Sequence, residues 1–193
     1  MSNLKDQLSG LKEKRGYLLP HHGLMAITSP KLLKAYDQAY TAIALEEKIL
    51  NTRDRELVWL AVLIATDEAL ASHHIPKFLS GGGSVDEFAA VRDGVPAVPE
   101  TALLSEKDTW LCAATVHAEL GRLELLKYSI IEAYNQQVLE LELAEALSIM
   151  MFPGSVPYYV EAAKIWLELI QDGHVNASDT FKAWANLEGQ GGY

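Results

Sequence analysis

Apolar residues recur along this chain at intervals of three and four, the period that places them on one buried face of an α-helix. One such set is Leu32, Leu33, Tyr36, Tyr40, Ile43 and Ala44. Strand signals are scarce, because no stretch alternates apolar and polar residues for long. The pattern predicts an all-α fold and assigns no strand.

Capping residues and prolines divide this pattern into helices. A serine directly before Pro30 predicts a helix that begins at Pro30 and runs to about Leu50. Thr52 or Asp54 can cap the next helix. Residues 57–65 of that helix form an apolar run with too few polar positions for a surface helix, so we expect it to be central.

The polar residues Thr66, Asp67 and Glu68 follow this run, and two interpretations of them stay open. They can begin a new helix, with an oxygen-bearing cap and acids in the first turn, or they can lie inside one continuous helix. Further along, Ser84 and Glu87 have the spacing of a capping box, in which each side chain bonds the backbone amide of the other. That spacing predicts a helix start at Ser84.

The turn residues also suggest a domain organisation. Glycine and prolines mark residues 93–100 as a linker between two halves, about 30–92 and 101–172, of a single helical domain. Residues 1–29 form an N-terminal segment, and we expect the tail 173–193 to be loosely ordered.

The two halves contain a weak internal repeat. Laying residues 55–74 over residues 144–163 aligns Glu56 with Glu145 and places a break and a second helix after each. Either duplication or the ordinary pattern of helix pairs explains this likeness. The second half is predicted to contain helices through residues 110–120, at about 123–137, and from about 141 with an interruption near two prolines.

Composition limits the class of partner. The 193 residues are 49% apolar, and 16 basic against 26 acidic side chains give a net charge of −10. Such a surface repels phosphates, so we expect neither nucleic acid nor a membrane as a partner. The longest apolar run falls well short of the roughly 20 residues of a membrane-spanning helix. The first residues show no apolar signal stretch, and Cys112 is a single cysteine, so we expect a cytoplasmic protein without a disulfide framework.

Glu56 and His74 are candidates for proton transfer, because histidine titrates near neutrality and a carboxylate can orient its ring. On one straight helix their separation of 18 residues would place them about 27 Å apart. A hairpin that turns near Thr66 would instead bring them to the same height. Without a catalytic role, Glu56 is a first-turn helix acid and His74 a partly buried histidine. Glu68 lies beside the break, where capping alone would explain it.

Metal and thiol chemistry have weaker support. His73 and His74 are neighbours, which on a helix lie about 100° apart, so they are weak candidates for binding one metal ion. We therefore predict neither a metal nor a cofactor. Cys112 lies in an apolar helix segment without a basic neighbour and is predicted to be a small buried hydrophobe. His21 and His22 are either exposed or packed against another subunit.

Three motifs occur in a specific order and spacing. They are Arg55-Glu56-Leu57 running into Ala61-Val62, then His73-His74-Ile75-Pro76, then Gly83-Ser84-Val85-Asp86-Glu87. In this order they resemble the carboxymuconolactone decarboxylase and AhpD-like alkylhydroperoxidase superfamily. The likeness is clearest from about Pro30 to Arg92 and continues more loosely to about Ile170.

The resemblance implies an AhpD-like helical bundle around a helical-hairpin core, assembled as a homo-oligomer, commonly a trimer or a hexamer. It places Glu56 on the family's acid before the apolar helix, His74 on its active-site histidine, and Glu68 on the first acid of a decarboxylase-type turn. The peroxidase branch needs Cys-x-x-Cys before the histidine, and residues 66–72 contain no sulfur, so AhpD-type peroxidase activity is not expected. Leu70 stands where decarboxylase-type members have a second acid.

Three functions from different classes follow. The first is a cofactor-free, decarboxylase-like enzyme acting on a small organic acid or lactone, with His74 as general acid or base, Glu56 orienting it and Glu68 assisting. The alternative is a non-catalytic helical oligomer that binds a small ligand or a partner protein. The third is metal-assisted hydrolysis through His73, His74 or His117.

Overall fold

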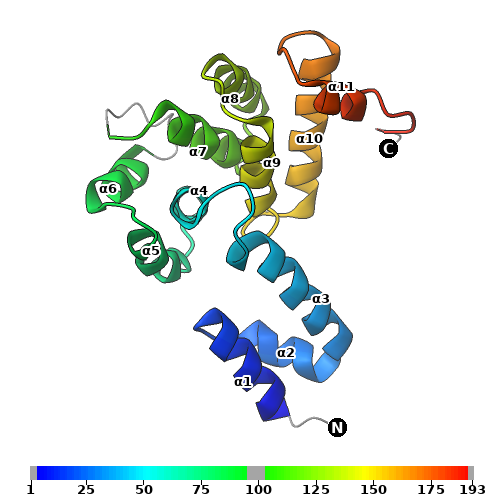
Figure 1. Ribbon diagram of the computed structural model, residues 1–193. Helices are drawn as coiled ribbons and strands as arrows, with labels where there is room; N and C mark the ends of the chain where they lie inside the picture. Colours follow the sequence, from blue (N-terminus) through cyan, green and yellow to red (C-terminus); the bar gives the residue numbers. More distant parts are fainter. Residues whose placement is uncertain (1–3, 95–102, 191–193) are drawn as a thin grey trace. The chain divides into compact units, whose positions relative to one another are not determined.

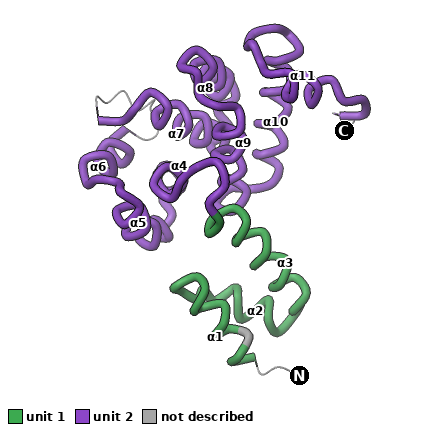
Figure 2. The backbone as a smooth tube through the Cα atoms, viewed as in Figure 1, with its two compact units in different colours: residues 1–46 green, residues 47–193 purple. Residues whose placement is uncertain are grey.

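The computed structural model describes residues 4–94 and 103–190, and every secondary-structure element within those ranges is helical, as predicted (Figure 1). The chain divides into two compact units, residues 1–46 and residues 47–193 (Figure 2). Pro30 begins a helix as expected, but that helix lies in the first unit and not at the start of the larger one.

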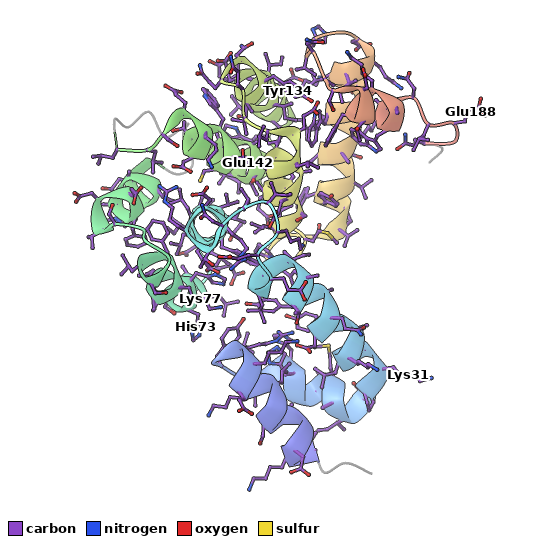
Figure 3. All side chains as sticks on the ribbon, in the orientation of Figure 1. Lys31, His73, Lys77, Tyr134, Glu142 and Glu188 are labelled. Atoms are coloured by element: carbon purple, nitrogen blue, oxygen red, sulfur yellow. The ribbon has the colours of Figure 1, made fainter. Side chains whose placement is uncertain are left out.

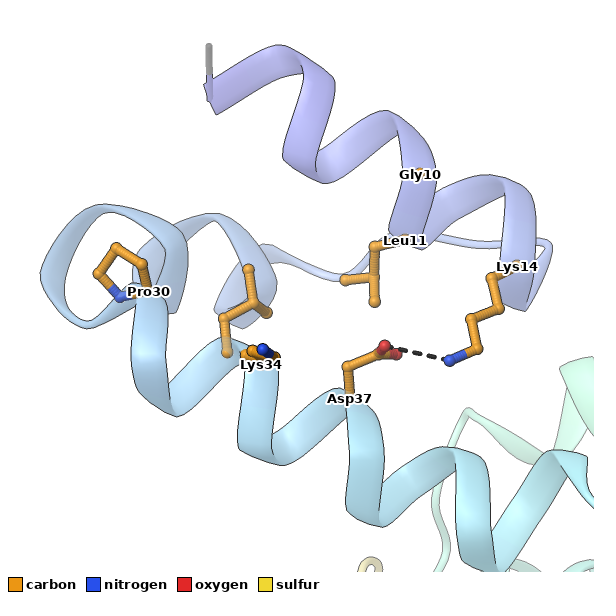
Figure 4. Close-up of a pocket in the computed structure, with 7 residues that line it drawn as sticks. Gly10, Leu11, Lys14, Pro30, Lys34 and Asp37 are labelled. Carbon is orange, nitrogen blue, oxygen red and sulfur yellow. Dashed lines mark hydrogen bonds and ion pairs between the residues drawn. The ribbon is translucent and has the colours of Figure 1, made fainter. Parts of the chain in front are cut away.

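The first unit contains α1 (Leu4–Arg15), α2 (Pro20–Thr28), α3 (Pro30–Tyr40) and a short π-helix (Thr41–Leu45). Its helices pack around a small core of Leu11, Ala26 and Leu33. A surface cavity of about 360 Å³ lies beside this core between α1 and α3, where Lys14 pairs with Asp37 at 3.1 Å (Figure 4). The unit therefore combines a minimal apolar core with charged contacts at its edge.

His22 is fully buried within this unit, which differs from both alternatives left open for it, exposure and packing against another subunit. Its Nδ1 accepts a hydrogen bond from the Leu19 amide at 3.0 Å, and its Nε2 lies 3.2 Å from Arg15. Burial, with help from His21 and Arg15, lowers the pKa of His22 to about 4. The exposed His21 contacts the Tyr36 hydroxyl at 3.2 Å.

The predicted helix from Pro30 to about Leu50 ends earlier, at Leu45. The reason is a competition for backbone amides after the π-helix. The amides of Ile49 and Leu50 donate to the Glu145 carboxylate, at 2.8 and 3.0 Å, instead of to helix carbonyls. Glu47 similarly accepts from the Thr52 amide at 3.0 Å. Side-chain acceptors thus replace the helical hydrogen bonds that would have continued the helix.

The second unit contains the remaining helices. They are α4 (Thr52–Ala65), α5 (Ala71–Ser80), α6 (Val85–Gly94), α7 (Glu106–Glu119), α8 (Leu123–Asn135), α9 (Glu140–Ile149), α10 (Val156–Gln171) and α11 (Asp179–Ala185). α4 and α7 are buried along almost their whole length, which confirms the central position expected for the apolar run at 57–65. α4 packs against α5, α6, α7 and α9, while α7 also contacts α8 and α10 (Figure 1).

Capping chemistry starts several of these helices as predicted. The Ser84 amide donates to Glu87 at 2.7 Å, and the Glu87 amide donates to the Ser84 hydroxyl at 3.1 Å. Ser105 caps α7 in the same way by accepting from the Asp108 amide at 3.1 Å. The side-chain oxygen of Asn51 caps α4, a position that the sequence assigned to Thr52 or Asp54.

The segment after residue 173, expected to be loosely ordered, contains α11. Its aromatic side chains hold it against α10, because Phe181 stacks on Trp166 with ring centres 5.0 Å apart and Trp184 meets the same ring edge-on at 5.9 Å. Most of the predicted linker at 93–100 lies outside the described residues. No helix among the described residues is long and apolar enough to cross a membrane.

Candidate active site

A sharp break separates α4 from α5. α4 ends at Ala65, and Asp67 then adopts a left-handed backbone conformation with φ of 55°. The Glu68 amide donates back to the Leu63 carbonyl at 2.8 Å, which closes the end of α4 before α5 begins at Ala71. Of the two interpretations of residues 66–68, the structure shows the hairpin.

The hairpin brings Glu56 and His74 into direct contact. His74 Nδ1 lies 2.7 Å from Glu56 Oε2, although 18 residues separate them in sequence. Glu56 is fully buried, and His74 keeps an exposed fraction of 3%. Since a carboxylate can only accept, Nδ1 is the donor in this contact, and in the tautomer that this selects Nε2 is the acceptor nitrogen. Nε2 makes no hydrogen bond to a described residue.

Neighbouring side chains hold both members of this pair. Arg55 Nη2 lies 3.7 Å from Glu56 Oε1, which supports the negative charge of the carboxylate. The indole of Trp59 stacks on the His74 ring, with centres 4.8 Å apart and planes 19° from parallel. Arg55, Glu56 and Trp59 all come from α4, so one buried helix positions the imidazole from two directions.

Glu68 does not join this pair in the structure. Its side chain is exposed in the turn between the two helices and makes no hydrogen bond or ion pair with the described residues. Its assisting role stays a prediction. His73, labelled on α5 in Figure 3, is exposed while His74 is buried, so the two rings face different surroundings. Within the described ranges, no three His, Cys, Asp or Glu side chains gather into a group that could hold a metal ion.

A charged network at the start of α4 was not anticipated from the sequence. Arg53 pairs with Asp54 and Asp108, each at 2.7 Å, and also with Glu87. Lys107 adds a pair to Asp54 at 2.7 Å. Burial opposes the charge of Arg53, but the hydrogen bonds to these carboxylates raise its pKa. The network joins the first turns of α4, α6 and α7, and therefore fixes the base of the hairpin that carries Glu56.

The second half of the unit contains further buried titratable groups, among them His117 and Cys112. His117 Nδ1 lies 2.9 Å from the Ser129 hydroxyl, which itself donates to the Leu125 carbonyl at 2.9 Å. Because that hydroxyl proton goes to a carbonyl, the pair lacks the geometry of an activated serine. Burial, and then Arg122, lowers the pKa of His117. Cys112 is buried as predicted, and burial raises the pKa of its thiol.

Glu119 is a further buried group, and the sequence pattern did not indicate it. Its exposed fraction is 5%, and its Oε2 is inaccessible and without a hydrogen bond. Burial raises the pKa of Glu119 to about 7. Gly154 leaves the space that the carboxylate occupies, because a Cβ at that glycine would overlap it. Glu145, aligned with Glu56 in the weak repeat, bonds backbone amides and not a histidine.

The comparisons with known proteins agree with the motifs. Residues 30–98 match the model of the carboxymuconolactone decarboxylase family, over a span that includes Glu56, Glu68 and His74. The resemblance inferred from the residues is thereby confirmed over this span, which is about a third of the chain. No curated protein and no solved structure matches the chain.

Proposed function

We propose that this protein catalyses acid–base chemistry, of the decarboxylase or lactone-isomerising kind, on a small organic acid or lactone without a redox thiol pair. The observation that carries the proposal is the buried 2.7 Å contact between Glu56 and His74. The match to the family model supports the proposal, because it spans both residues. Peroxidase chemistry has no support, since it needs a reactive thiol and the one cysteine, Cys112, is buried in α7 and does not belong to the hairpin.

In this proposal Glu56 is a positioning residue and His74 is the catalytic one. Glu56 accepts from Nδ1, which selects the tautomer whose Nε2 can take a proton from substrate carbon or oxygen. The nearby carboxylate also stabilises the imidazolium that forms, and the fixed ring can return the proton to product. Decarboxylation or lactone isomerisation needs such proton delivery together with stabilisation of an enolate. Glu68, exposed in the turn, would assist from outside the buried pair.

The proposal includes a homo-oligomer, a trimer or hexamer as the resemblance implies. Exposed apolar side chains in the second unit, among them Leu139 and Val156, are the kind of surface that such an assembly covers. The alternative function is a non-catalytic oligomer in which Glu56 and His74 only stabilise the hairpin. If the pair has only this structural role, replacing the His74 imidazole should leave any measured turnover unchanged.

His74→Gln is expected to lower kcat/KM by about 100-fold, because general acid–base catalysis by one positioned histidine contributes about that much or more. Substrates are found by incubating the protein with a panel of small keto acids and carboxylated lactones and following CO₂ release and ring absorbance. Glu56→Gln should retain a histidine but lose its orientation, so it should lower kcat more than it raises KM.

His73→Gln is the matched control, since it makes the same substitution one residue away at an exposed position. It should keep kcat/KM within about twofold of the original protein. Equal activity of His74→Gln and His73→Gln on every accepted substrate would refute the proposal and leave the fold-stabilising role of the pair.

A further inference from the structure

The second unit contains an aromatic cavity between α9, α10 and α11, which lie beside one another in Figure 1. Its volume is about 350 Å³, within the range of about 300–1,000 Å³ that small-molecule sites occupy. Four aromatic side chains line it, namely Tyr159, Trp166, Phe181 and Trp184. This site does not involve the hairpin that carries Glu56 and His74.

The rings around the cavity are held in fixed positions. Trp166 is the centre of the group, since Phe181 stacks on it and Trp184 meets it edge-on at 5.9 Å. The Trp166 indole N–H donates to the Tyr134 hydroxyl at 3.0 Å, and that hydroxyl donates to Glu140 at 2.8 Å. The indole is therefore anchored from outside the cavity, and the cavity walls are preorganised aromatic faces and edges.

The lining also indicates the charge of a ligand. None of the described residues that line the cavity is ionised near neutral pH. The hydroxyl of Tyr159 has no hydrogen-bond partner among the described residues, so it is available to a ligand oxygen. A carboxylate placed here would lose its hydration and meet the negative faces of the rings without gaining an opposite charge. The surroundings favour an uncharged, planar, largely apolar molecule.

We propose that this cavity is a binding site for a small, uncharged aromatic molecule. The ligand stacks against the aromatic walls supplied by α10 and α11, and its single polar group meets the Tyr159 hydroxyl. Because α11 supplies two of the four rings, a bound ligand also bridges α10 and α11.

The proposal is tested by isothermal titration calorimetry of the whole protein with 1-naphthol, and with 1-naphthoate as its charged counterpart. We expect saturable binding of 1-naphthol with a Kd below about 1 mM, and a Kd for 1-naphthoate that is at least tenfold higher. Ala144 lines the cavity from α9, so Ala144→Leu fills it and should weaken 1-naphthol binding at least tenfold. The control Ala183→Leu makes the same change at an exposed position of α11 and should bind within twofold of the original protein.

A second measurement does not depend on any cavity-filling variant. In ¹H–¹⁵N spectra, 1-naphthol should shift the indole resonances of Trp166 and Trp184 and leave that of Trp59, which stacks on His74, in place. Absence of binding, equal binding of 1-naphthoate, or shifts confined to Trp59 would each overturn the proposal. A change of oligomeric mass in Ala144→Leu would also overturn it, since the cavity would then be a contact between copies. None of these outcomes depends on turnover by His74.

Discussion

Arg53→Leu is expected to lower the free energy of unfolding by about 3 kcal/mol, because it leaves buried carboxylates without their cation. The destabilisation arises mainly at Asp108, whose side chain is 4% exposed and whose one ion pair within the described part of the chain is with Arg53. Its Oδ1 already lacks a hydrogen bond, and Ser105 would be its one remaining side-chain partner. Asp54 would keep its ion pair with Lys107 and should therefore account for a smaller part of the lost stability. Urea unfolding followed by circular dichroism measures the change.

Arg92→Leu is the matched control for this variant. Arg92 pairs with Asp93 on the surface, where both side chains are more than half exposed and solvent screens the pair, so its loss should leave the free energy of unfolding unchanged within error. Asp108→Asn should rescue part of the Arg53→Leu defect, because it removes the stranded charge. Equal effects of Arg53→Leu and Arg92→Leu would show that the network contributes no net stability.

The elements of the fold were largely readable from the sequence because they are set locally. The Ser84–Glu87 capping box and the Ser105 cap rest on contacts within one turn, while the helix at Pro30 begins at a proline and its preceding Ser29 makes no side-chain cap. The predicted end of the helix after Pro30 was wrong, because the amides of Ile49 and Leu50 donate to Glu145, about one hundred residues away in sequence. A carboxylate so distant in sequence leaves no signal in a local pattern.

In the candidate site, too, features that depend on a local turn were predicted and contacts between distant residues were not. Glu56 and His74 were predicted as a pair conditional on a turn near Thr66, and the left-handed Asp67 supplies that turn. The environment of Glu119 could not be predicted, since the carboxylate lies against Gly154 in the turn before α10. In the sequence Glu119 is one residue within the helix predicted at 110–120, and the structure ends α7 there; nothing in the local pattern indicates that the carboxylate is desolvated.

The free energy of unfolding is expected to fall as pH rises because Glu119 becomes charged, and Glu119→Gln is expected to abolish this fall. Burial raises the pKa of this carboxyl from 4.5 to about 7, so the folded state holds the proton more tightly than the unfolded chain does. The stabilisation is complete below about pH 4.5 and is lost as pH rises through about 7, where the folded protein must bury a charge without a partner. Between about pH 5 and pH 8 the titration of Glu119 should lower the free energy of unfolding by about 2.5 kcal/mol.

The measurement is the difference in unfolding free energy between the original protein and Glu119→Gln, taken by urea titration at several pH values. Subtracting the two curves cancels groups that both proteins share, such as His22, whose lowered pKa makes stability fall as the solution becomes more acidic. Glu124→Gln, at a side chain that is 86% exposed, should give a flat difference. If the Glu119→Gln difference is equally flat, the carboxyl titrates normally, and water must then reach the space beside Gly154.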